Sequence, residues 1–213
     1  MYKKAYISIR AYTELKEWLT DKGYNLIEFP EGDKPYPTIS SHPDIYISDT
    51  GKKLIIQNEV NYKYPDYLAY NGIFLDRYFI HNLKYTSPIL VNKAKIMGLE
   101  LINVNQGYTK CSCVVVDGRS IITADEGIAK TLEAYDIDVL KIRTGHVKLD
   151  GFDYGFIGGA SGRVENCIVF NGDLSTHPDH ESIREFILRR GLEIVDFNGL
   201  ELYDIGTIFV NKQ

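Results

Sequence analysis

The chain has 213 residues, of which 44% are hydrophobic and 25% are charged, and its formal net charge at pH 7 is −5. These proportions are typical of a soluble globular protein and exclude a disordered or fibrous chain. The Lys and Arg residues are scattered, which argues against nucleic acid as a partner, because the phosphate backbone is bound by clustered basic side chains.

The predicted elements of the first half of the chain alternate between short strands and helices. In chain order, we expect strand 4–9, helix 13–22, strand 23–29, strand 44–48, strand 53–57, helix 65–70, strand 78–81, helix 88–97 and strand 98–104. Residues 59–86 are less regular than the rest. They are consistent either with a degenerate repeat unit or with an insertion, and we favour the repeat unit.

The second half of the chain repeats the same order of elements. The expected segments are strand 111–116, strand 120–124, helix 126–135, strand 136–142, strand 152–158, strand 167–170, helix 178–190, strand 191–197 and strand 204–210. The repeating unit is therefore strand, strand, helix, strand. Such internal repetition is typical of rings, propellers and solenoids.

Two further features extend this repeat. Gly23, Gly98 and Gly191 each follow a helical segment and precede an alternating strand pattern, as expected for glycines that end a helix in the left-handed conformation. The last strand, 204–210, lacks a partner and a helix, whereas residues 4–22 supply a strand and a helix. Joining the end of the chain to its beginning completes a unit, so we expect about five units closed into a ring.

This arrangement resembles the pentein fold of the guanidino-group-modifying enzymes, an α/β propeller of five such units around a pseudo-fivefold axis. The chain is most similar to a bacterial branch of that fold, and the segment 106–113 (QGYTKCSC) is its most distinctive stretch. Members of the superfamily include arginine and agmatine deiminases, dimethylarginine hydrolases, amidinotransferases and a non-enzymatic ribosome anti-association factor. The resemblance implies a single α/β domain over residues 1–213.

Aligning the repeats places several polar residues at comparable loop-to-strand junctions, which a ring would bring to one end of its axis. These residues are Asp44, Cys111 or Ser112, Asp153 and Asp204. Three carboxylates at one axis would repel one another, and a guanidinium or amidinium ligand would relieve that repulsion through paired hydrogen bonds. Asp is also common in exposed turns, so the same pattern is compatible with surface loops.

Cys111 is the expected nucleophile of a cysteine hydrolase. The segment leading to it resembles the Gly-rich loop that carries the catalytic cysteine in the enzymes resembled, and Lys110 would favour the thiolate. His146 follows Gly145, as in the histidine loop of the deiminases, and is the expected acid and base. The enzymes resembled carry their cysteine in the final unit, where this chain has none. Burial of Cys111 or Cys113 in a strand is the structural alternative, and we expect Cys167 to be structural.

His42 belongs to a second candidate motif, His42-Pro43-Asp44, which precedes a predicted strand and is not explained by helix capping. We therefore expect His42 to lie with the ligand-binding aspartates. A related segment, residues 176–181, contains His177, Asp179 and His180. It suits either the start of a helix or, in a weaker hypothesis, a metal-dependent hydrolase.

The leading functional hypothesis is thus a protein that binds or hydrolyses a small guanidino or amidino compound, with no metal or organic cofactor implied. The alternative is a non-catalytic ring that binds a macromolecular partner. Residues 1–10 lack the continuous apolar stretch of a secretory signal, and three cysteines do not form a disulfide framework. No apolar run reaches the roughly 18 residues of a membrane span. We therefore expect a cytoplasmic protein with free thiols.

Overall fold

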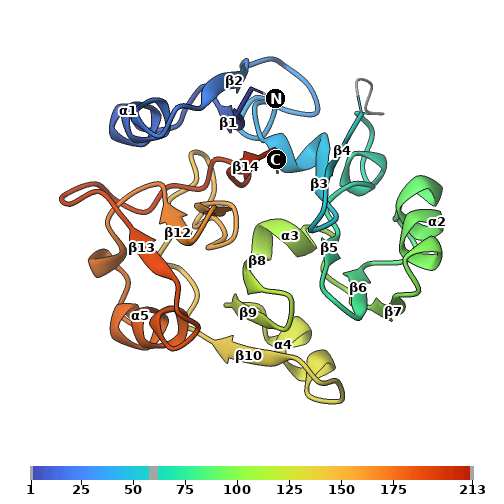
Figure 1. The fold of residues 1–213 in the computed structure, drawn as a ribbon. Coiled ribbons are helices and arrows are strands. Elements are labelled where there is room, and N and C mark those ends of the chain that lie inside the picture. The colour runs from blue at the N-terminus through green and yellow to red at the C-terminus, as the bar shows by residue number, and fades with distance from the viewer. Residues whose placement is uncertain (1, 58–61, 212–213) are drawn as a thin grey trace.

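A computed structural model describes residues 2–57 and 62–211, and the chain forms a mixed α/β fold built from five small sheets rather than one closed barrel. Figure 1 shows these sheets placed around a common centre, with the longer helices at the periphery. Four of the sheets contain three strands, and the fifth contains two.

The three-stranded sheets share one topology, in which the first two strands are antiparallel and the last two are parallel. A helix connects the two parallel strands, which cannot be joined by a tight turn. Three of these units are β5 (Ile73–Phe74), β6 (Tyr78–His81), α2 (Pro88–Ile96) and β7 (Glu100–Asn103); β8 (Cys113–Asp117), β9 (Ser120–Thr123), α4 (Glu126–Leu132) and β10 (Asp138–Lys141); and β11 (Ser161–Val164), β12 (Cys167–Phe170), α5 (His180–Leu188) and β13 (Glu193–Val195).

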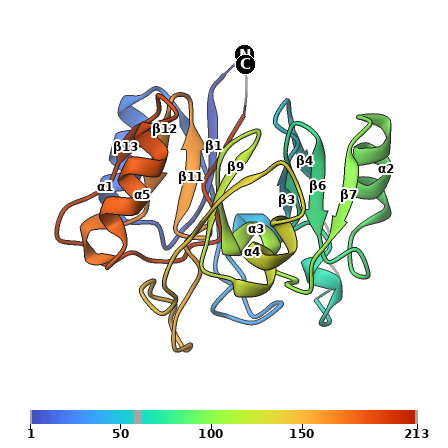
Figure 2. The same ribbon diagram turned by 90° about the horizontal axis from the view of Figure 1, so that it is seen from below.

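The fourth three-stranded sheet joins segments from the two ends of the chain. It contains β14 (Phe209–Val210), β1 (Lys4–Ser8), α1 (Thr13–Asp21) and β2 (Asn25–Phe29). Ala5 pairs with Val210 and Tyr6 with Phe209 in antiparallel register. The predicted completion of one unit by the first and last strands is therefore confirmed (Figure 2).

The fifth sheet, formed by residues 47–56, is the irregular unit of the structure. The sequence suggested residues 59–86 instead. β3 (Ile47–Asp49) and β4 (Leu54–Ile56) form a hairpin with no helix and no third strand among the described residues. The predicted short helix and strand within 59–86 are present as η2 (Asp66–Leu68) and β6, and they lead into a complete unit. The helix at 88–97 thus belongs with β5 and β6 and not with the 44–57 hairpin. Residues 58–61 lie outside the described part of the chain.

Each of the four long helices buries an i, i+4 pair of apolar side chains, which places both members on one face. The pairs are Leu15 and Leu19, Leu90 and Ala94, Ile128 and Leu132, and Ile183 and Ile187. The core is divided into clusters that join neighbouring sheets, such as Val114 and Ile122 with Ile168 and Phe170. No helix among the described residues is long and apolar enough to cross a bilayer.

The first strand of several units is shorter than predicted. The residues expected to begin these strands form short helices or loops and make no strand pairing. Asp44 lies in η1 (Pro43–Ile45), and Cys111 lies in α3 (Thr109–Ser112). Asp204 lies in a loop before β14. The predicted strand 152–158 is wrong: this segment is a loop, and its amides bond to loop partners, including the Val147 carbonyl and the Asp204 carboxylate.

Candidate functional site

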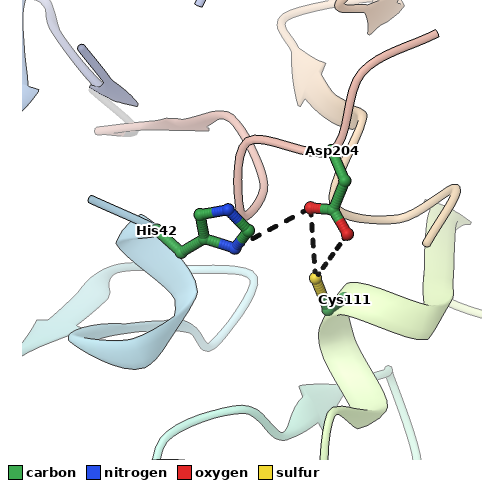
Figure 3. A group of neighbouring side chains, drawn as sticks. All are labelled: His42, Cys111 and Asp204. Carbon is green, nitrogen blue, oxygen red and sulfur yellow. Dashed lines mark hydrogen bonds and ion pairs between the residues drawn. The ribbon is translucent and has the colours of Figure 1, made fainter. Parts of the chain in front are cut away.

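Three buried side chains from separate units meet near the centre of the molecule: His42, Cys111 and Asp204 (Figure 3). The Cys111 thiol lies 3.5 Å from Oδ1 and 3.6 Å from Oδ2 of Asp204. On the other side, Nδ1 of His42 lies 3.8 Å from Oδ1. The three residues are only 1–3% exposed, so the structure holds a thiol, a carboxyl group and an imidazole in direct contact and away from solvent.

Asp204 is held in place by its own surroundings. The backbone N–H groups of Phe156 and Gly206 donate to its two carboxylate oxygens, at 2.8 and 3.0 Å. Burial, followed by the negative charge of Asp44, raises the pKa of Asp204 to about 7. The group is thus positioned to exchange a proton near neutral pH.

Asp44 is the second buried carboxyl group at this centre. Its Oδ2 accepts a hydrogen bond from the Thr207 hydroxyl at 3.1 Å, and burial raises its pKa. Its backbone N–H donates to the Gly206 carbonyl at 3.0 Å. The structure places Asp44 beside Cys111 and Asp204, and neither acid starts a strand.

Asn71 ties these segments together and was not identified from the sequence. Its amide oxygen accepts from the backbone N–H groups of Lys110 and Cys111, at 2.8 and 3.1 Å. Its amide nitrogen donates to the backbone carbonyl of Asp44 at 3.3 Å. This one side chain fixes the position of the Cys111 backbone relative to Asp44. No local pattern in the sequence distinguishes Asn71 from an ordinary loop asparagine.

The surroundings of the Cys111 thiol disfavour its thiolate form. Burial, followed by the charges of Asp204 and Asp44, raises its pKa well above the ordinary value. Lys110 acts in the opposite direction, as expected from the sequence, but its effect is the smallest of these. Its ammonium group bonds to the Cys113 carbonyl and the Thr207 hydroxyl, both at 3.3 Å.

His42 is a neutral imidazole in this site. Burial lowers its pKa to about 3, and the positive charge of Arg10 acts in the same direction. Its ring packs against Gly206, whose φ is +75° and where an added Cβ would lie 2.2 Å from the His42 Cβ. The motif His42-Pro43-Asp44 thus places both a histidine and an acid beside Asp204.

The structure does not bring the other two predicted site residues to Cys111. His146 and Asp153 are exposed, in the long loop between β10 and β11. The His146 ring contacts the His177 ring, with centroids 5.3 Å apart. His42, rather than His146, is the histidine beside the Cys111–Asp204 pair. The alignment of the repeats, which suggested Asp153, and the resemblance to the deiminase loop, which suggested His146, both failed to place these residues because this long loop carries them outward.

The alternative metal cluster at residues 176–181 is occupied by protein contacts. Asp179 accepts from the Arg143 backbone and guanidinium, at 2.6–2.9 Å, and His177 Nδ1 accepts from the Asp179 N–H at 3.0 Å. His180 bonds to the His177 carbonyl at 2.9 Å. The segment does lead into a helix: η3 (Leu174–Thr176) is followed by α5, which begins at His180 with Asp179 at its N-cap position.

An aromatic cluster adjoins the centre, built from η2 and three loops. The Tyr108 hydroxyl lies 3.1 Å from that of Tyr36 and donates to that of Tyr67 at 3.2 Å, and the Tyr108 ring packs against Phe156. Phe156 is the residue whose N–H holds Asp204, so the cluster and the site share a loop.

A separate cavity of about 970 Å³ opens among the inner strands, and Lys110 and Thr207 line it. His42, Cys111 and Asp204 do not line this cavity. The Thr207 hydroxyl, which also bonds Asp44, therefore stands between the cavity and the site.

Comparison with known proteins supports the fold assignment. A crystal structure of a dimethylarginine dimethylaminohydrolase, a pentein-fold enzyme, matches with a TM-score of 0.55 and 11% identity, over 92% of each chain. An agmatine deiminase of C. jejuni matches with a TM-score of 0.40 and 10% identity, over 86% of this chain and 55% of that one. No curated protein sequence matches. A model of a family of unknown function, DUF6873, matches residues 52–209, so the chain belongs to that family.

Proposed function

We propose that this member of the DUF6873 family binds a small guanidino or amidino cation at the buried acidic centre and hydrolyses it with Cys111 as the nucleophile. The observation that carries the proposal is the contact of the Cys111 thiol with both carboxylate oxygens of Asp204, at 3.5 and 3.6 Å. Asp44 supplies a second buried acid. A planar cation with several N–H donors satisfies such a pair of acids.

The roles of the acids follow from their surroundings. A general base is most effective when its pKa lies near the working pH, and the pKa of Asp204 is about 7. His42, with a pKa of about 3, is poorly suited to this role and instead orients the attacking water. Asp44 is the principal partner of the cation. The positive charge of the bound ligand then lowers the pKa of the Cys111 thiol, which burial and the two acids raise.

The reaction is a substitution at the central carbon of the ligand. The Cys111 Sγ bonds to this carbon while the thiol proton passes to Asp204. The C–N bond breaks, and the leaving nitrogen departs as an amine with that proton. Water adds to the carbon of the S-linked intermediate, the C–S bond breaks, and the thiol is restored. The product keeps the water oxygen as a carbonyl, and the amine takes up the remaining proton.

Selective labelling of Cys111 tests this proposal. Chloroacetamidine is a cation and chloroacetamide is its neutral counterpart, so the ratio of their reaction rates reports recognition of charge. We expect a high ratio at Cys111 and a low ratio at Cys113 and Cys167, measured by mass spectrometry. Asp44→Asn should lower the ratio at Cys111 by about tenfold or more, because a hydrogen bond to a charged group contributes about 1.5–3 kcal/mol.

Asp153→Asn is the matched control, because it removes an exposed carboxylate from the neighbouring loop and should leave the ratio unchanged. Arginine or agmatine should slow the labelling of Cys111. A Cys111 that labels no faster than the other two thiols and gains no protection from these cations contradicts the hydrolase. A non-catalytic binding ring would then be the better account of the fold.

The proposal extends to the architecture. The five sheets are interpreted as the blades of a pentein-type propeller around a pseudo-fivefold axis, within one domain. The shared antiparallel-parallel topology of four sheets supports this interpretation. The three buried cysteines are free thiols, which suits a reducing cytoplasmic compartment.

A further inference from the structure

The cavity of about 970 Å³ among the inner strands is large enough for a ligand of its own. Its lining includes Thr207, beside the candidate site, and Lys3 and Asn211, near the two chain ends that lie on one face of the molecule (Figure 2). Small-molecule sites in proteins usually have volumes of about 300–1,000 Å³. The cavity therefore has room for a small organic molecule.

Two basic side chains line this cavity and lie along one strand. The Lys110 ammonium group donates to the Cys113 carbonyl, and the Arg163 guanidinium group donates to the Val116 carbonyl. Both acceptors belong to the inner strand β8. Lys110 and Arg163 are only partly buried, so part of each side chain is accessible from the cavity.

Both cations are bonded to neutral acceptors. Besides the two carbonyls of β8, Lys110 bonds to the Thr207 hydroxyl at 3.3 Å, and Nε of Arg163 bonds to the Glu165 carbonyl at 2.9 Å. Neither cation forms an ion pair within the described part of the chain. An ammonium group has three donors and a guanidinium group has five, so each keeps N–H groups for a further acceptor. Burial lowers the pKa of both groups, and an anion bound beside them would offset this effect.

Acidic side chains also line the cavity, and two of them have cationic partners of their own. Glu165 pairs with Lys3 at 2.7 Å, and Asp117 lies 3.5 Å from the Arg190 guanidinium. These pairs leave the two cations beside β8 available to a ligand.

The spacing of the two cations indicates the form of the ligand. Cys113 and Val116 are three residues apart, a distance of about 10 Å at the usual rise of a strand. A charge-assisted hydrogen bond to a carboxylate takes about 2.8 Å at each end, so about 4–5 Å remains between the two anionic groups. A linear dicarboxylate of about four to six carbons has this span. The apolar side chains of Ile73, Ile208 and Phe209 on the lining suit its methylene chain.

We propose that this cavity binds a linear dicarboxylate, with one carboxylate on Lys110 and the other on Arg163. The two cations supply the charge that the ligand lacks, and the apolar wall between them excludes shorter or more polar anions. The site stands on the lining of the cavity alone and does not depend on the chemistry of Cys111.

Isothermal titration calorimetry on the full chain tests this proposal, with glutarate as the probe. We expect one glutarate to bind per chain. Pentanoate has the same number of carbons and one carboxylate, so it should bind at least about tenfold more weakly, because one cation stays without a partner. Pentane-1,5-diamine has a similar length and the opposite charge, and it should not bind.

Lys110→Met and Arg163→Met each replace one cation by an apolar side chain. Each should weaken glutarate binding by about tenfold or more. Each should also abolish the preference for glutarate over pentanoate, since only one carboxylate keeps its partner; a general disturbance of the cavity would weaken both ligands alike. Lys130→Met and Arg189→Met, at exposed positions, are the matched controls and should bind glutarate as the wild type does.

The melting temperature shows whether each variant is folded, and Arg163→Met decides the outcome if Lys110→Met does not fold. Three results would overturn the proposal: no binding of glutarate by the wild type, unchanged binding by folded Arg163→Met, or binding of the diamine instead.

The two proposals fail separately. Cys111→Ser removes the proposed nucleophile, which does not line the cavity, and should keep the glutarate affinity of the wild type. Loss of glutarate binding in this variant would place the ligand at the hydrolase site and refute the cavity. Glutarate binding without cation-selective labelling of Cys111 would refute only the hydrolase.

Discussion

Gly159 shows how a single residue shapes the candidate site. Its N–H donates to the Cys111 carbonyl at 2.8 Å, and its own carbonyl accepts from the N–H groups of Ile205 and Thr207. The backbone therefore passes directly beside the thiol and the carboxylate. Only a residue without a side chain allows that approach, whatever its backbone conformation.

Gly159→Ala should lower the free energy of unfolding by about 1–3 kcal/mol, the usual cost of overpacking, and displace the Asp204 carboxylate from Cys111. Urea unfolding and cation-selective labelling measure the two effects. Gly32→Ala is the control, because a Cβ there meets nothing within 4 Å. Equal stability of the two variants would contradict the close packing at Gly159.

His81 is a second buried residue with a defined role. One ring nitrogen lies 2.7 Å from the Thr86 hydroxyl and the other lies 3.0 Å from the Gly107 carbonyl, in the loop that leads to Cys111. Burial lowers its pKa to about 4. In the unfolded chain the pKa of histidine is about 6.5, so the unfolded state binds the additional proton between these values.

Stability should therefore fall as the pH drops from about 6.5 toward 4, with a limiting slope of about 1.4 kcal/mol per pH unit from this one histidine. Above pH 6.5 both states are neutral and the contribution of His81 is fully present. His81→Gln should reduce the slope by about one proton, measured by urea unfolding between pH 5 and pH 7. His146→Gln, at an exposed position, is the control and should keep the slope of the wild type. A wild-type slope in His81→Gln would refute the contribution of His81 to the pH dependence.

At the scale of elements, the N-terminus of α4 connects helix capping to the site. Oδ1 of Asp125 accepts from the Ile128 N–H at 2.8 Å, and Oδ2 accepts from the Gln106 side chain at 3.0 Å. Gln106 in turn accepts from the Tyr108 N–H at 3.0 Å, one residue before α3. Through Gln106, the N-cap residue of α4 therefore also holds the loop that precedes α3 and Cys111.

Asp125→Ala should lower the free energy of unfolding by about 1–2 kcal/mol, the usual cost of losing an N-cap. The change should also reduce the protection of the 106–108 amides from hydrogen exchange, because Gln106 loses its partner. Glu133→Ala, at the exposed C-terminal end of α4, should change stability by less than about 0.5 kcal/mol. A similar effect of the two variants would argue against the cap.

At the scale of the whole molecule, β14 links the first and last units. It pairs with β1, and the Ile208 N–H bonds to Ser161 in β11 at 3.0 Å. Phe209 is 3% exposed and lies between these strands. If the five sheets form one cooperative domain, a destabilising substitution in β14 lowers the stability of all five sheets together.

Phe209→Ala should lower the free energy of unfolding by about 3–5 kcal/mol, the usual cost of deleting a buried aromatic ring. Circular dichroism and tyrosine fluorescence should report a single coincident transition in both proteins. Tyr2→Ala, at a side chain that is 81% exposed, is the control and should have little effect. Two separate transitions would contradict the single domain.

The local features of the chain could be predicted because they depend on neighbouring residues. The expected helical segments are present, and Gly23, Gly98 and Gly191 follow helices with φ of +82°, +71° and +70°. The repeat predicted the order of strands within a unit. It did not predict the ends of the inner strands, where Asp44 and Cys111 lie in short helices, because those turns are set by contacts with other units.

The sequence by itself therefore determined the order of strands within a unit, the joining of the two chain ends in one sheet, and the choice of Asp44, Cys111 and Asp204 as candidate site residues. Only the tertiary structure decided which histidine joins them. Cys111 and Asp204 are 93 positions apart, and their contact depends on how whole units pack. Spacing within one unit carries no information about that packing, so His42 and His146 were both plausible until the loops were placed.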